Sequence, residues 1–505
     1  MTTRPADTDT TTFPNPVYAR TVLAPIYDHA KTVFGEPLMR INRAHCVMLA
    51  ETQVLPQDEA ARIAVALGRI EASDILAPSA YTGEHEDLFF EVEAALKDAL
   101  GAELGGKLHT ARSRNDLDHT IFRIRLKSVI DGFLAKARAL AHAMLEAARA
   151  GKADIVVAYT HGQPAQPTTY GHYLSGALET LLRDVERLEA ARAIVDLSPM
   201  GAAAITTTGF PIDRARMADL LGFAAPTRNS YASIAGVDYV TATYSAVSLM
   251  MLHLGRLVQD FQYWTAFEVG QLYVANSLVQ ISSIMPQKRN PVPIEHLRHL
   301  ASTASGQADT MVRTMHNTPF TDMNDSESVV QAAGLVAFET AGRVADLLAA
   351  VLGAARVEPA NVRRNIDRSC ITITELADTL VREEGLSFRD AHEIAAAVAR
   401  SVVARGGVLS GGFAAFAEAF EDHAGRATGL DAAAFRSAVS PEHFVAVRER
   451  FGGPGPRAMD EALASYGNTV AAFDERATAR AAHEAGAADR LADAFGALAG
   501  TAAGE

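Results

Sequence analysis

Residues 122–144 read FRIRLKSVIDGFLAKARALAHAM. Apolar residues recur along this stretch at spacings of three and four, which place them on one side of an α-helix. The pattern therefore predicts a long helix that buries one continuous apolar stripe. This stripe comprises Phe122, Leu126, Val129, Phe133, Ala137, Leu140 and Met144.

Further long helices are predicted along the middle of the chain. Residues 174–195 repeat the apolar spacing, and residues 237–267 are apolar on nearly all sides, as in a helix buried inside a bundle or an assembly. We expect a fourth helix after Pro291 and a fifth from near Val329. Because no alternating strand pattern of comparable strength lies between them, the sequence predicts an all-α protein built on a central five-helix bundle.

Interruptions of this pattern suggest the domain limits. Up to about residue 115, shorter helices are broken by proline and glycine, and from about residue 365 short amphipathic segments return between glycine pairs. We therefore expect an N-terminal helical domain at 1–115, the bundle at 116–365 and a small helical domain at 366–476. Residues 477–505 are rich in alanine and punctuated by glycine, and we expect them to form a frayed or disordered tail.

Composition excludes several classes of protein. The 505 residues include 46 Lys and Arg against 60 Asp and Glu, a net charge of −14, which disfavours nucleic acid or an acidic membrane as a partner. Two cysteines cannot build a disulfide framework, and we find neither a signal-peptide pattern at the N-terminus nor an apolar run of about 20 residues. We therefore expect a cytoplasmic protein.

Three polar clusters do not fit the apolar stripes. The first cluster, residues 109–116, reads HTARSRND and places two arginines beside Ser113 and Asn115 just before the first long helix. Arginine grips carboxylates with two parallel hydrogen bonds, and a helix N-terminus favours anions. The alternative is a plain polar loop in which Asn115 or Asp116 caps the helix.

The second cluster, residues 159–169, reads YTHGQPAQPTT and joins the first two long helices. In this loop His161 is a candidate proton carrier or anion donor, although a single histidine is more often structural. The third cluster, residues 281–291, reads ISSIMPQKRNP. A serine acts as a base only where cations, N–H donors or a helix dipole stabilise its alkoxide, and this segment carries hydroxyls, cations and an amide together. A solvated linker is the alternative for the third cluster.

Taken together, the three clusters resemble the signature regions of the aspartase/fumarase superfamily, and the string Ser282-Ser283-x-Met285-Pro286-x-Lys288-x-Asn290 is its hallmark. The first and second clusters are similar to those of the argininosuccinate lyase branch. The resemblance implies a homotetramer with a twenty-helix core, in which three subunits build each active site. It also implies β-elimination from a small N-succinyl compound to give fumarate and an amine, without a metal or an organic cofactor.

The resemblance also implies roles for individual residues. Ser282 would be the base, His161 the second catalytic residue, and Lys288 would stabilise the carboxylate of the dianionic intermediate. The remaining residues would bind substrate: Arg112, Ser113, Arg114, Asn115, Thr160, Gln166, Ser283, Met285, Asn290, Asn324 and Glu327.

The sequence departs from the branch at several positions. Ile281 and Ala111 stand where the family usually has glycine, and Phe89 stands where it usually has histidine. Within residues 318–327, Asn324 and Glu327 take the places of a Gln and a Lys that grip the arginine half of the substrate. Replacing a cation by an anion reverses the local charge preference.

These departures lead to three hypotheses. The first is a carbon–nitrogen lyase for an N-substituted aspartate whose leaving group bears amines, of the ethylenediamine-disuccinate type. The second is an argininosuccinate lyase that grips arginine with other residues. The third is a structural homotetramer without activity.

Overall fold

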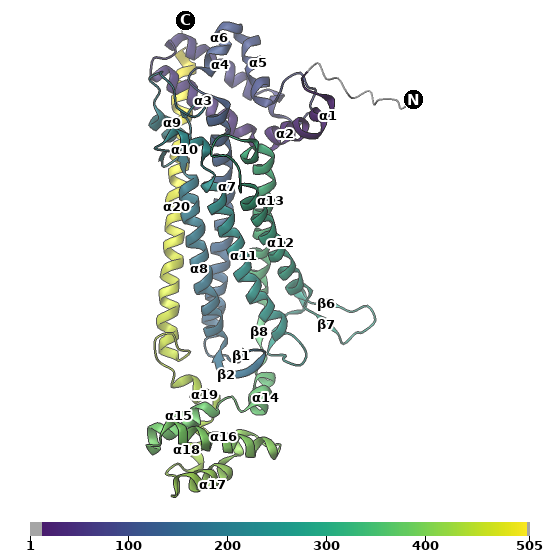
Figure 1. Ribbon diagram of the computed structural model, residues 1–505, viewed down its shortest axis with the longest axis vertical. Helices are drawn as coiled ribbons and strands as arrows, with labels where there is room; N and C mark the ends of the chain where they lie inside the picture. The colour runs from purple at the N-terminus through teal and green to yellow at the C-terminus, as the bar shows by residue number, and fades with distance from the viewer. Residues whose placement is uncertain (1–12, 502–505) are drawn as a thin grey trace.

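The computed structural model describes residues 13–501, and most of them are helical. In Figure 1 the long helices run along the molecule, a group of shorter helices lies at one end, and a small helical domain lies at the other. This arrangement confirms the prediction of an all-α fold. From the sequence we expected no signal peptide at the N-terminus. Residues 1–12 of that stretch lie outside the described residues.

The bundle contains the predicted helices. Its core includes the predicted stripe residues Leu126, Phe133 and Met144, all nearly inaccessible to solvent. Leu249 and Leu252, in the segment that is apolar all round, are 41% and 53% exposed in the single chain. The five helices are α7 (Arg114–Ala150), α8 (Tyr170–Val195), α11 (Asp238–Trp264), α12 (Val292–Thr314) and α13 (Ser328–Ala354).

The N-terminal domain surrounds the start of α7 with a core of its own. Leu38, Leu67, Phe89 and Phe122 belong to this core, so α7 contributes its first turns to the domain and the rest to the bundle. Helix α7 begins at Arg114, close to the predicted boundary at 115, but its first turns pack in the N-terminal core. The elements are α1 (Pro16–Tyr18), η1 (Ala19–Leu23), α2 (Ala24–His29), η2 (Ala30–Phe34), α3 (Gly35–Glu51), α4 (Gln57–Glu71), η3 (Asp74–Leu76), α5 (Leu88–Leu100), α6 (Ala102–Gly106) and η4 (Lys107–His109).

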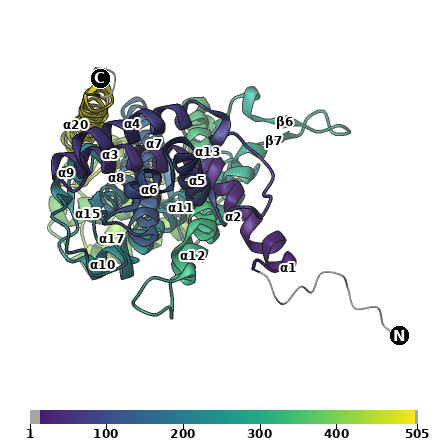
Figure 2. The same ribbon diagram turned by 90° about the horizontal axis from the view of Figure 1, so that it is seen from above.

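Short strands and helices connect the long helices. β1 (Ile155–Thr160) pairs with β2 (Gln163–Thr169), and β6 (Gln280–Ile281) with β7 (Arg289–Asn290), so the second and third clusters are hairpins and not plain loops. Figures 1 and 2 both show the β6–β7 hairpin projecting from the bundle. The other connecting elements are β3 (Leu197–Ser198), α9 (Arg214–Leu221), β4 (Ala225–Pro226), α10 (Ser230–Ala235), β5 (Leu272–Val274), η5 (Asn276–Leu278), η6 (Asn324–Ser326) and β8 (Ala355–Val357).

The small domain after the bundle is held by its own aromatic core. The rings of Phe416 and Phe435 stack with their centroids 5.0 Å apart, and Phe420 packs edge-on against Phe416. The predicted boundary at 365 falls inside α14. The elements are α14 (Pro359–Ser369), α15 (Ile373–Glu384), α16 (Phe388–Ala404), η7 (Leu409–Gly411), α17 (Phe413–Ala424), α18 (Ala432–Ala438) and α19 (Pro441–Ala446).

The C-terminal segment is not the tail that we expected. Through Thr501 it belongs to α20 (Pro456–Thr501), a 46-residue helix about 70 Å long that returns along the bundle to the N-terminal domain. Its side chains Phe473, Leu491 and Leu498 are buried at heptad-compatible spacings. The alanine-rich composition suggested fraying, but alanine favours helix and lets a helix approach its neighbours closely.

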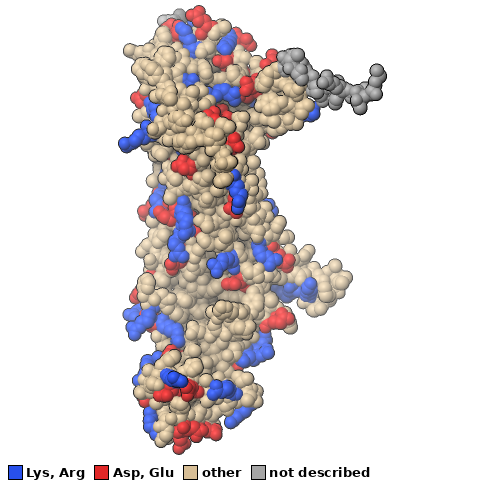
Figure 3. All heavy atoms as spheres, viewed as in Figure 1, with Lys and Arg blue, Asp and Glu red and all other residues tan. Residues whose placement is uncertain are grey.

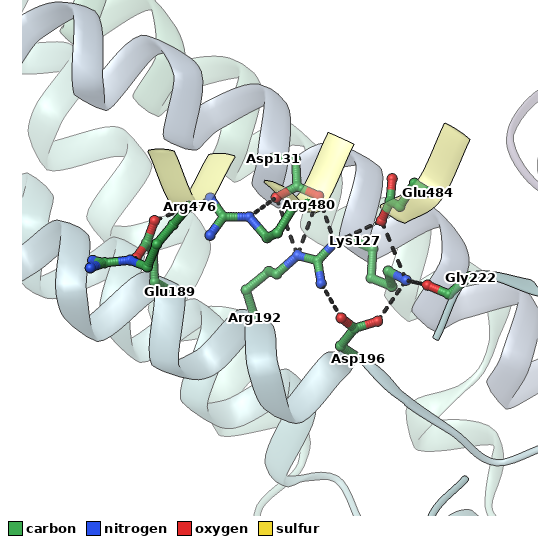
Figure 4. A network of polar contacts seen from close by, with 9 residues as sticks. All are labelled: Lys127, Asp131, Glu189, Arg192, Asp196, Gly222, Arg476, Arg480 and Glu484. Atoms are coloured by element: carbon green, nitrogen blue, oxygen red, sulfur yellow. Dashed lines mark hydrogen bonds and ion pairs between the residues drawn. The ribbon is translucent and has the colours of Figure 1, made fainter. Parts of the chain in front are cut away.

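Buried charges also hold α20 in place (Figure 4). Arg192 of α8, only 3% exposed, contacts Asp131 of α7 at 2.9 Å and Glu484 of α20 at 2.7 Å. Lys127 contacts Glu484 at 3.3 Å, and Arg480 of α20 contacts Asp131 at 3.4 Å. Each charge has a partner of opposite sign, so the network joins three helices without an isolated buried charge.

On the face drawn in Figure 3, acidic and basic side chains intermingle. Within residues 13–501, no helix is both long and apolar enough to span a membrane.

Candidate active site

The first cluster forms the N-terminus of α7. The Oγ of Ser113 accepts a hydrogen bond from the N–H of Asn115 at 3.4 Å, and the N–H of Ser113 donates to Asp116 Oδ1 at 2.9 Å. This is a capping box, so the N-cap is Ser113, and not Asn115 or Asp116 as in the alternative interpretation of this cluster. The amide of Asn115 is left to donate outward, to the carbonyl of Ala204 at 3.1 Å.

Asp116 attaches a further loop to this cluster. Its Oδ2 accepts hydrogen bonds from the N–H groups of Gly201 at 2.9 Å and Ala203 at 3.0 Å. Burial raises the pKa of Asp116 to about 6, although its N–H donors favour the charged form. The loop that begins at Gly201 thus lies beside the first cluster. The sequence carries no signal for this loop, because residues 201–209 contain no charged group.

Arg112 points away from this surface. Its Nη1 donates to Oδ1 of Asn42 at 2.7 Å, and its guanidinium lies 5.8 Å from the centroid of the Phe89 ring. Burial lowers the pKa of Arg112 to about 10. The aromatic ring at position 89 therefore covers a buried cation, and Arg112 supports the cluster from inside the N-terminal domain.

A cavity of about 520 Å³ opens next to the first cluster, between the N-terminal helices, α7 and the start of α13. Arg114, Asn115, Asn324 and Glu327 all line it, so the structure brings together four of the predicted substrate-binding residues. Arg114 makes its closest ion pair with Asp87, at 2.5 Å.

Acidic side chains that our sequence analysis did not single out also line this cavity. Asp87 and Glu86 come from the turn before α5, and Asp118 lies one helical turn after Arg114. Burial raises the pKa of Asp118 to about 8. The negative charges of Asp87 and Glu327 contribute to this rise, and only Arg114 lowers the pKa. The i,i+4 spacing from Arg114 is a sequence signal for Asp118, whereas no local pattern indicates Asp87.

Burial raises the pKa of Glu327 as well, and Asp322 adds to the effect. The carboxylate of Asp322 contacts His119 of α7, whose Nε2 lies 3.3 Å from Asp322 Oδ1. The cavity thus combines one guanidinium with several carboxylates, an arrangement that suits a ligand bearing more positive than negative groups.

The second cluster lies at the opposite end of the bundle. α7 has 37 residues, so its two ends are about 55 Å apart. Thr160 and His161 are exposed at the tip of the β1–β2 hairpin, where His161 has φ +55° and Gly162 has φ +73°. Two successive residues with positive φ are typical of the tight two-residue turn that joins the strands of a β-hairpin. Gln166, on β2, lines a separate cavity of about 420 Å³.

The third cluster forms the projecting β6–β7 hairpin. The Oγ of Ser282 accepts hydrogen bonds from the N–H of Ile284 at 3.4 Å and of Met285 at 3.1 Å. Arg289 fixes the base of the hairpin by donating to the carbonyl of Val274 at 2.7 Å. The side chain of Ile281 is 75% exposed within β6, where a β-branched residue suits the extended backbone. The remaining predicted residues of this cluster are Ser283, Met285, Lys288 and Asn290, and all lie on the same hairpin.

One chain therefore brings together only part of the predicted site. The first cluster and residues 324–327 share a cavity at one end of the bundle, while the second and third clusters lie toward the other end (Figure 1). Among residues 13–501 no group of three or more His, Cys, Asp or Glu side chains is arranged to hold a metal ion.

Comparison with known proteins gives the family. Residues 32–306 match the family described as lyase, and residues 370–446 match the argininosuccinate lyase C-terminal family. The chain is 61% identical to argininosuccinate lyase 2 of Agrobacterium fabrum, over 98% of this chain and 99% of that protein. The chain belongs to the argininosuccinate lyase family. As a member of that family it is a carbon–nitrogen lyase.

More distant relatives agree with this assignment. The argininosuccinate lyase of Methanoculleus marisnigri is 34% identical to this chain, over 85% of this chain and 86% of that protein. A variant of EDDS lyase with bound fumarate superposes with a TM-score of 0.82 and 28% identity, over 95% of this chain and 96% of that one. The resemblance to the aspartase/fumarase superfamily that the three clusters indicated is thereby confirmed.

Proposed function

We propose that this enzyme cleaves argininosuccinate to fumarate and arginine. The observation that carries the proposal is the 61% identity, over nearly the full length of both chains, to a protein named argininosuccinate lyase 2. This was the second of our hypotheses from sequence.

The charges in the cavity beside Arg114 support this choice of substrate. The arginine part of argininosuccinate carries a guanidinium group, an α-ammonium group and one carboxylate. Asp87, Asp118 and Glu327 line the place where the two cations would bind, and a bound cation favours the ionised form of Asp118 and Glu327; Arg114 offers a guanidinium to the carboxylate. Glu327 therefore does not exclude arginine, although it stands where the family usually has a lysine.

The proposed mechanism uses residues from three subunits of a homotetramer. Ser282 removes the proton next to the succinyl carboxylate, and Lys288 and Asn290 stabilise the dianionic intermediate. His161, from the end of a second bundle, assists charge stabilisation or leaving-group protonation. Thr160 from that same hairpin binds the fumarate half together with Ser113 and Asn115. The distance of about 55 Å along α7 between the first and second clusters supports an antiparallel arrangement of subunits.

A second candidate is a lyase for an N-substituted aspartate whose leaving group bears amines, of the ethylenediamine-disuccinate type. Two observations favour it: the exchange of lysine for Glu327, and the likeness to EDDS lyase at 28% identity. The amines of such a leaving group would pair with the acidic side chains of the cavity, and Arg114 would keep its ion pairs with Asp87 and Glu86 or bind a carboxylate of the leaving group.

One experiment separates the candidates. The purified protein is incubated with argininosuccinate and with a panel of N-substituted aspartates, and fumarate is followed by its ultraviolet absorbance. Fast turnover of argininosuccinate alone supports the first candidate and excludes the second. Turnover of diamine-derived substrates with little or no turnover of argininosuccinate reverses that conclusion.

A further inference from the structure

A separate cavity of about 500 Å³ lies where the N-terminal domain meets α7 and α20. It shares no lining residue with the cavity beside Arg114. Its size is within the range of pockets that hold small molecules.

Four basic side chains line this second cavity: Lys31, Arg40, Arg125 and Lys127. Only two acidic side chains, Glu36 and Glu484, line it with them. In a protein of net charge −14, this local excess of positive charge is unusual.

Two of the four cations already have carboxylate partners. Lys31 contacts Glu91 at 3.2 Å, and Lys127 contacts Asp196 at 2.6 Å. The other two differ. Arg40 donates to a neutral acceptor, the carbonyl of Leu221, at 3.1 Å.

Arg125 is the least satisfied of the four. Its Nε is buried, and it has no hydrogen-bond partner among residues 13–501. A buried donor without an acceptor is unfavourable, and for a charged group the cost is larger. This Nε is itself inaccessible to solvent, so an anion in the cavity would meet the terminal nitrogens of the guanidinium, whose charge no carboxylate within residues 13–501 neutralises.

We propose that this cavity binds a small metabolite through a phosphate or carboxylate group held between the guanidinium groups of Arg40 and Arg125. Arginine presents paired N–H donors that match both kinds of anion. Lys127, which is paired with Asp196 and Glu484, lies beside them in the wall, and the hydroxyl of Ser128 offers a further donor. The proposal does not depend on which substrate the enzyme cleaves.

The position of the cavity gives binding a structural consequence. Lys127 and Glu484 line the cavity and also belong to the charge network that holds α20 against the bundle (Figure 4). A ligand that binds only the folded protein raises its thermal midpoint. We therefore expect a bound anion to raise the thermal midpoint of unfolding, because it neutralises the charges of Arg40 and Arg125 where the N-terminal domain meets α7 and α20.

The test is calorimetric titration of the full-length protein at low ionic strength, with inorganic phosphate and with citrate as the two probes. We expect one site per chain, and affinity about tenfold weaker in Arg125→Gln and in Arg40→Gln. The probe that binds more tightly distinguishes phosphate from carboxylate as the preferred group. Arg125→Lys, which keeps the charge, should retain part of the affinity.

Two controls decide between this cavity and other sites. Arg389→Gln changes an exposed arginine of the small domain, and Arg114→Gln changes the cavity of the candidate active site. Both variants should keep this binding. The proposal fails if neither probe binds the wild type up to millimolar concentration. It also fails if Arg125→Gln binds as tightly as the wild type, or if Arg114→Gln removes the binding.

Discussion

At the scale of single residues, Ala111 shows how a departure from the family pattern is accommodated. Its φ is +63°, in the left-handed region that side chains with a Cβ disfavour, and the family usually has glycine at this position. We predict that Ala111→Gly raises the free energy of unfolding by about 1 kcal/mol. Thermal denaturation measures this change. Ala135→Gly, inside α7, is the matched control and should destabilise the protein by a similar amount.

Asp118 provides a second prediction at this scale, through pH. Its pKa is raised from an ordinary 3.8 to about 8, so the folded state loses stability relative to the unfolded state as pH rises through that window. Asp118→Asn removes this loss. We expect the variant to gain several kcal/mol over the wild type near pH 8, and little near pH 4. Denaturation at both pH values measures the difference, and an equal effect at both would contradict the assignment.

At the scale of elements, the long helices could be predicted because each buries a stripe with a period of about 3.6 residues. The β1–β2 hairpin could not, since Pro164 and Pro167 lie within β2 and the sequence lacks a clear alternation of polar and apolar residues. Its turn depends on His161 adopting a left-handed conformation, which the sequence alone does not reveal.

The end of α20 was missed for a different reason. Its buried residues Ala487, Leu491 and Leu498 are widely spaced among alanines and glycines, so the stripe is thin, and its partners lie hundreds of residues earlier in the chain. The charge network that fixes it likewise joins residues from distant parts of the sequence.

The buried end of α20 predicts a measurable cost. Leu491 is 2% exposed and packs in the core of the N-terminal domain. Leu491→Ala should lower the free energy of unfolding by about 3 kcal/mol, through lost burial and the cavity left behind. Asp493→Ala, an exposed position on the same helix, should change it by less than about 0.5 kcal/mol. Thermal or urea denaturation compares the two. Equal, negligible effects would mean that this segment is a loose tail after all.

At the scale of the whole molecule, the sequence identified the three clusters but not where they lie. The residues at 112–115 and 324–327 are far apart in sequence yet meet at one cavity, because α12 returns the chain to the end of the bundle where α7 begins. Asp87 and Asp118 complete the polar lining of that cavity, and only the tertiary structure brings Asp87 there. The separation of the clusters within one chain is the physical reason to expect shared sites.

Shared sites lead to a prediction about mixtures of variants. In the proposed homotetramer, Ser282→Ala lacks the proposed base and Asn115→Ala lacks a proposed fumarate-binding group from the opposite end of the bundle, so either variant alone should be nearly inactive. When both chains are co-expressed in equal amounts, a site is intact if the chain supplying Ser282 and the chain supplying Asn115 are both unaltered at those positions. Random assembly gives this in roughly a quarter of the sites, so about a quarter of the wild-type fumarate production should return.

The matched control is a second mixture, in which chains carrying Ser282→Ala are co-expressed with chains carrying Lys288→Ala. Both changes lie on the β6–β7 hairpin, so one chain supplies both residues to any site, and no mixture of these two chains restores an intact set. Activity in the first mixture and none in the second would establish that the ends of different bundles meet in one site. Without any recovery in the first mixture, or with equal recovery in both, the three-subunit site would have to be abandoned even if argininosuccinate proves to be the substrate.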